Sequence, residues 1–99
     1  MADRSLDAAL QRIWERARPR LLARVDAIDD AIAALDDSES VATGRADAHK
    51  IAGLAGTFGL GEASRLARSI EHQLEAGERA DPERLRREAV QLRAHLTAP

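Results

Sequence analysis

Apolar residues recur every three or four positions along most of this 99-residue chain, and this spacing constrains its fold more than any other feature. Such spacing places side chains on one face of a helix. The first run is Leu6, Leu10, Ile13, Ala17, Leu21, Val25, Ile28, Ile32 and Leu35. Pro19 interrupts the run, because proline lacks an N–H group and disfavours helix at the preceding residue. The apolar spacing nevertheless keeps its register across Pro19. We therefore expect two nearly continuous helices, or one kinked helix, over residues 5–37.

Three further helical segments follow the first run. One spans Val41 to Phe58. The next has an apolar stripe made of Leu60, Ala63, Leu66, Ala67, Ile70 and Leu74. The last begins at Asp81 and Pro82, which suit the N-cap and the first helical position, and its apolar face is Leu85, Ala89, Leu92 and Leu96. No segment alternates polar and apolar residues like a strand. We predict a single all-α domain over residues 1–99, an antiparallel four-helix bundle with an N-terminal lead-in helix.

Composition excludes several classes of function. Seventeen acidic against fifteen basic residues give a net charge of −2, which predicts no nucleic-acid partner. The absence of cysteine rules out disulfides and thiolate metal sites, and no apolar run is long enough to span a membrane. Neither phosphate-binding glycine motif, G-x-x-x-x-G-K-[ST] or G-x-G-x-x-G, occurs. We expect a cytoplasmic protein with no membrane contact, no bound cofactor and no metal.

The segment from Val41 to Phe58 has an unusual surface. On a helical wheel, Ile51, Leu54 and Phe58 cluster opposite His49, which predicts an inward-facing side and an exposed imidazole. The face around His49 carries only small residues, namely Ala42, Ala46, Ala52, Gly53 and Gly56. Such a face lets the backbone of another protein approach the imidazole closely. It could equally pack against another helix, as in a homodimer.

Residues 48–60, AHKIAGLAGTFGL, resemble the signature of histidine-containing phosphotransfer (HPt) domains, roughly A-H-x-x-K-G-x-x-x-x-x-G-[LA]. The resemblance implies that Nε2 of His49 accepts a phosphoryl group from the aspartyl phosphate of a response-regulator receiver domain, or from a sensor histidine kinase, and passes it on. It also implies that Mg²⁺ belongs to the receiver and that the chain is a carrier without kinase activity of its own. The alternative is a helical docking or dimerisation module without phosphoryl traffic.

One departure from the family signature concerns its lysine. Many HPt domains carry lysine three residues after the histidine, where this chain has Ala52. Lys50 and Arg45 are the candidate substitutes, and the alternative for both is a solvated side chain. The resemblance further implies that Glu71 accepts a hydrogen bond from Nδ1 of His49. The alternative is that Glu71 pairs within its own helix, with a residue such as Arg68. We expect His72 and His95 to be ordinary surface residues.

Overall fold

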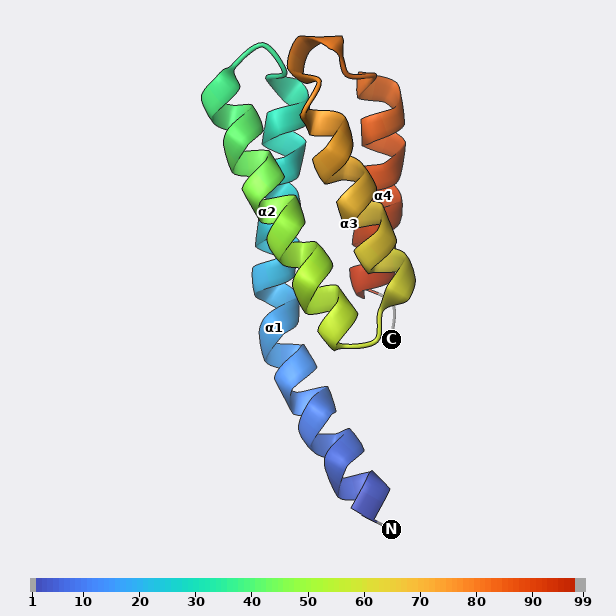
Figure 1. Ribbon diagram of the computed structural model, residues 1–99. Helices are drawn as coiled ribbons and strands as arrows, with labels where there is room; N and C mark the ends of the chain where they lie inside the picture. The colour runs from blue at the N-terminus through green and yellow to red at the C-terminus, as the bar shows by residue number, and fades with distance from the viewer. Residues whose placement is uncertain (1, 98–99) are drawn as a thin grey trace.

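The computed structural model describes the backbone of residues 2–97 and the side chains of residues 7–97. It contains α1 (Ala2–Ala33), α2 (Ser38–Thr57), α3 (Gly61–Leu74), the short 3-10 helix η1 (Gly77–Arg79) and α4 (Pro82–Thr97). The four long helices run alternately up and down, and α1 and α3 each pack against both α2 and α4 (Figure 1). The predicted all-α four-helix bundle is confirmed.

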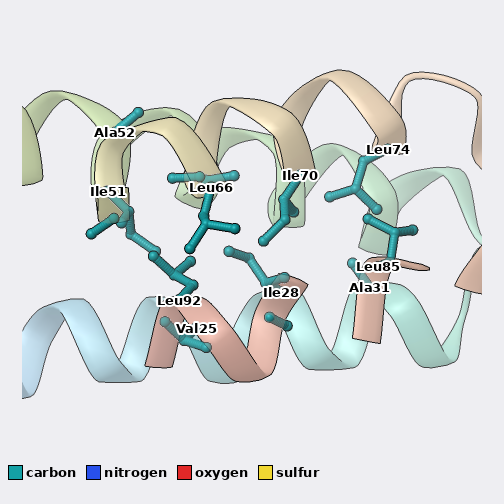
Figure 2. Close-up of a cluster of buried hydrophobic side chains, with 14 of the residues drawn as sticks. Val25, Ile28, Ala31, Ile51, Ala52, Leu66, Ile70, Leu74, Leu85 and Leu92 are labelled. Carbon is teal, nitrogen blue, oxygen red and sulfur yellow. The ribbon is translucent and has the colours of Figure 1, made fainter. Parts of the chain in front are cut away.

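The core contains one apolar face of each long helix (Figure 2). Burying a large aliphatic side chain contributes about 1.5 to 3 kcal/mol, so this cluster is the main source of stability. The largest side chains that are fully buried are Leu21, Val25, Ile28, Ile51, Leu66, Ile70, Leu74, Leu85, Leu92 and Leu96. The three-and-four spacing thus predicted the core correctly wherever four helices lie side by side.

Helix α1 is longer than the bundle that it belongs to. It continues through Pro19 without a break, and its N-terminal part extends beyond the other helices with a change of direction (Figure 1). The predicted lead-in is therefore part of α1 and not a separate helix. Leu10 and Ile13 are 46% and 52% exposed, so the prediction that they lie on a buried face is wrong. The side chain of Leu6 lies outside the described part of the chain.

The reason for this exposure is the length of the partner helices. α1 has 32 residues, whereas α2 has 20 and α4 has 16. At 1.5 Å per residue, neither partner can cover the whole of α1. Trp14 and Phe58 mark the end of the covered part, with ring centroids 5.2 Å apart in an edge-to-face arrangement.

The wheel prediction for the inner face of α2 is correct only in part. Ile51 is fully buried, whereas Leu54 is 40% exposed, and Phe58 is partly buried against Trp14 outside the main core. Successive residues of a helix point about 100° apart, and Ala55 is the residue that faces the core, which turns Leu54 away from it. The prediction that Leu54 points inward is therefore wrong.

A close crossing of α1 and α2 depends on Gly44, a residue for which the sequence suggested no role. A Cβ atom added at Gly44 would lie 2.5 Å from the Cβ of Ala31. Real Cβ atoms do not approach so closely, so the two helix backbones can pack at this distance only with glycine on one side. The contact fixes α2, and with it the residues of its outer face, on the bundle.

The helix ends follow the local sequence. The Asp81 carboxylate accepts hydrogen bonds from the backbone N–H groups of Glu83 and Arg84 at 3.0 and 3.3 Å, and Pro82 is the first residue of α4, as predicted. Gly59, with φ of 74°, lies in the left-handed region that ends α2. Gly59 thus allows the turn from α2 into α3, and Asp81 caps the start of α4.

Candidate functional site

His49 lies in the middle of α2 with its side chain 75% exposed, as predicted. Its Nδ1 atom is 3.1 Å from Oε2 and 3.3 Å from Oε1 of Glu71, which projects from α3. An ionised carboxylate only accepts hydrogen bonds, so in the neutral ring Nδ1 carries the proton and its N–H donates a hydrogen bond to Glu71. The lone pair of the neutral imidazole is then on Nε2, the outer nitrogen.

The spacing of α2 and α3 makes this contact possible. Ala63 and Ala67 present small side chains on the buried face of α3, and the Ser64 hydroxyl donates a hydrogen bond of 2.9 Å to the backbone carbonyl of Ala52. Ala52 is only 4% exposed and lies in this interface. The prediction that Ala52 belongs to the docking face is therefore wrong, because it points toward α3 and not outward.

The other four small residues of the predicted docking face are exposed, namely Ala42, Ala46, Gly53 and Gly56. A Cβ atom added at Gly53 would meet no atom within 4 Å, and one at Gly56 would lie 3.7 Å from the hydroxyl of Ser64, an ordinary contact. Packing within this chain therefore does not require glycine at either position. These residues leave space on the outer surface of α2 beside His49.

Two basic side chains lie beside the imidazole. Arg45 and Lys50 line the same open hollow as His49 and Glu71, together with Ala42 and Ala46. Arg45 also forms an ion pair with Glu75, the residue directly after α3, with 3.5 Å between a guanidinium nitrogen and Oε1. The structure thus brings together every predicted charged residue of the site.

The other histidines lie in different surroundings. The His72 side chain is 85% exposed, and its Nδ1 atom is 3.7 Å from the Glu75 carboxylate. His95 lines a separate hollow of about 380 Å³ with Trp14 and Phe58 at the end of the bundle. Among the side chains of residues 7–97, no group of three or more His, Cys, Asp or Glu could hold a metal ion. No helix in that part of the chain is long and apolar enough to cross a membrane.

A family model for the Hpt domain matches residues 6–98, nearly the whole chain. The chain belongs to the Hpt domain family. Searches of curated proteins and of solved structures gave no match. Hpt domains act in histidine phosphotransfer of two-component signalling, in relays with kinases and receiver domains. The resemblance found in residues 48–60 is thereby extended to the full helical domain.

In this Hpt domain, Glu71 of α3 and Glu75, which directly follows α3, each contact a nitrogen-bearing side chain of α2. Glu71 contacts His49, and one helical turn further along Glu75 contacts Arg45. Sequence reasoning found the first pair and missed the second. The sequence spacing could have predicted the second pair. Arg45 precedes His49 by four residues and Glu75 follows Glu71 by four, so antiparallel packing of the two segments brings both pairs together.

Proposed function

We propose that this Hpt domain carries a phosphoryl group on Nε2 of His49, between receiver-domain aspartates or from a sensor histidine kinase to a receiver. The observation that carries the proposal is the contact of Nδ1 with Glu71 in a side chain that stays 75% exposed. The contact orients the ring and leaves the nucleophilic nitrogen toward the solvent, where a partner can reach it.

The transfer step follows from this geometry. The lone pair of Nε2 attacks the phosphorus of an aspartyl phosphate, a P–N bond forms, the P–O bond breaks, and the receiver keeps its carboxylate. The ring gains positive charge during the step, since Nδ1 still holds its proton. The Glu71 carboxylate stabilises that charge, with Oε2 at 3.1 Å from Nδ1. The reverse step benefits as well, because a ring that remains protonated leaves phosphorus more readily.

The surface beside His49 suits an approaching receiver. The exposed small residues Ala42, Ala46, Gly53 and Gly56 form the proposed docking face and leave the in-line path to Nε2 open. Lys50 and Arg45 are the groups of this chain that can balance the charge of the phosphoryl group. The Mg²⁺ that assists the chemistry belongs to the receiver, which supplies the aspartate.

The test is transfer from purified receiver domains that carry a labelled aspartyl phosphate. The unmodified chain should acquire a label that is acid-labile and stable to base, as expected of phosphohistidine. His49→Gln should abolish the label, whereas His72→Gln, a change at an equally exposed histidine, should keep it. A label that persists in the His49 variant would show that another residue is the acceptor. No label with any receiver or kinase would favour the docking or dimerisation module.

A further inference from the structure

Arg45 lines two neighbouring hollows that differ in charge. On one side it lines the hollow that contains His49, Lys50 and Glu71. On the other side it lines a hollow whose charged residues, besides Arg45 itself, are all acidic, namely Asp36, Glu75 and Glu78. Its guanidinium is paired with Glu75 in the acidic hollow. One side chain thus lines both hollows, and in the unphosphorylated chain its guanidinium is paired on the acidic side.

We propose that Arg45 is paired with Glu75 in the unphosphorylated chain, and that it leaves Glu75 to bind the phosphoryl group when His49 is phosphorylated. The inference rests on the proposed function and adds a residue that regulates it. Arg45 lies four residues before His49, on the same side of α2, where neighbouring side chains reach one another. Glu75 is a positioning residue in this account, since it acts through Arg45 and does not itself contact the phosphoryl group.

The strengths of the interactions allow the exchange. The side chains of Arg45 and Glu75 are 44% and 51% exposed, and exposed ion pairs are weak, about 0.2 to 1 kcal/mol. A phosphoryl group carries nearly two negative charges and three acceptor oxygens, so it competes well for a guanidinium. Glu75 is also 3.7 Å from Nδ1 of His72 through its other oxygen. It therefore keeps a second nitrogen-bearing side chain nearby when Arg45 leaves.

The proposal predicts a change in the stability of the phosphorylated chain relative to the unphosphorylated one. The equilibrium constant of phosphoryl transfer between receiver and chain measures this change. A phosphorylated receiver is mixed with the chain, and the amounts of both phosphoproteins are determined before hydrolysis becomes significant. The equilibrium constant compares free phosphorylated and unphosphorylated proteins, so a change in docking alone does not alter it. Glu75→Gln should shift the equilibrium toward phosphohistidine by about threefold, within the range that an exposed ion pair permits.

A double-mutant cycle separates release of Arg45 from simple loss of a negative charge. Arg45→Ala should shift the equilibrium toward the receiver, and in that background Glu75→Gln should have clearly less than its threefold effect. Arg45→Lys, which keeps the charge, should recover part of the loss. The same fold-change for Glu75→Gln in both backgrounds would overturn the proposal and leave the phosphotransfer function standing. A complete absence of phosphorylated chain would overturn both.

Discussion

The reactivity of His49 depends on which ring nitrogen is occupied. Glu71 accepts from Nδ1, so the free nitrogen is Nε2, on the exposed side of the ring. Without such a contact, the imidazole would exist as two tautomers and its side chain would adopt several rotamers. One carboxylate from the neighbouring helix restricts both choices, and the same carboxylate balances the charge that develops during transfer.

Substitutions at Glu71 separate these two effects. Glu71→Gln keeps a side-chain oxygen that can accept from Nδ1 but removes the charge, whereas Glu71→Ala removes both. A charge-assisted hydrogen bond contributes about 1.5 to 3 kcal/mol, and partial exposure lowers this value, so we expect Glu71→Ala to slow single-turnover transfer about tenfold. Glu71→Gln should fall between it and the unmodified chain. Equal rates for all three proteins would show that Glu71 does not position the imidazole.

At the scale of a single helix, α2 uses glycine for two different purposes. Gly44 faces Ala31 of α1 at the closest crossing of the bundle, whereas Gly53 faces open space beside His49. Both cost helix stability, since glycine is about 1 kcal/mol less favourable than alanine in a helix interior. Gly44 allows α1 and α2 to pack closely, and Gly53 leaves the outer surface beside His49 free of a side chain.

Substitutions of these two glycines should therefore change stability in opposite directions. Gly53→Ala should raise the free energy of unfolding by up to about 1 kcal/mol. Gly44→Ala should lower it by about 1 to 3 kcal/mol, because the added methyl group forces α1 and α2 apart. Denaturant melts measure both. A destabilised Gly53→Ala variant would mean that this surface is packed.

Gly53→Gln extends the comparison to function. The larger side chain should leave the fold intact and slow transfer from a phosphorylated receiver, by crowding both the docking face and the path to Nε2. Single-turnover rates, with Gly53→Ala as the milder change, measure this effect. Unchanged transfer with glutamine at this position would show that the receiver does not contact the proposed docking face.

The start of α2 responds to pH through its N-cap residue. The Ser40 hydroxyl donates to Oδ2 of Asp37 at 2.6 Å, and this hydrogen bond lowers the pKa of the Asp37 carboxyl in the folded chain. A folded pKa below the unfolded one stabilises the fold above the unfolded pKa, and that contribution is lost as pH falls through the folded value. Ser40→Ala should therefore raise the pKa of Asp37 in an NMR titration. A pKa that does not move would contradict the assigned cause.

At the scale of the whole molecule, the bundle is shorter than its first helix. The longest dimension is 52 Å, against 19 and 17 Å across, and the N-terminal part of α1 extends past the other helices (Figure 1). Apolar spacing alone does not show where a helix leaves its partners. Leu10 and Ile13 continue the pattern of Leu21 and Val25 perfectly, yet only the second pair is buried.

A matched pair of truncations measures where the core ends. Leu21→Ala removes a fully buried side chain and should lower the free energy of unfolding by about 2 to 5 kcal/mol. Ile13→Ala removes an exposed one and should change it by no more than about 0.5 kcal/mol. Urea titrations of both variants measure these changes in the free energy of unfolding. A large loss for Ile13→Ala would mean that the protruding segment is covered in solution.

The sequence predicted the four helices, the core and the charged residues around His49, because these depend on periodicity and on a local motif. Its errors lie where a residue stands at the edge of a face, or where α1 extends past its partners, as at Leu10 and Ile13. Ala52 and Leu54 differ by about 200° on the wheel, and burial depends on how α3 and α1 cover each side. The Gly44 crossing and the Arg45–Glu75 pair depend on contacts between segments far apart in the sequence, which no single segment encodes.

The most direct measurement is to identify the phosphorylated atom. The chain is phosphorylated by a receiver domain, and NMR spectroscopy that correlates phosphorus with the ring protons distinguishes Nε2-phosphohistidine from the Nδ1 isomer. Because Glu71 engages Nδ1, the account predicts a single phosphohistidine, at His49 and on Nε2. Phosphorylation on Nδ1 of His49, or on His72 or His95, would contradict it.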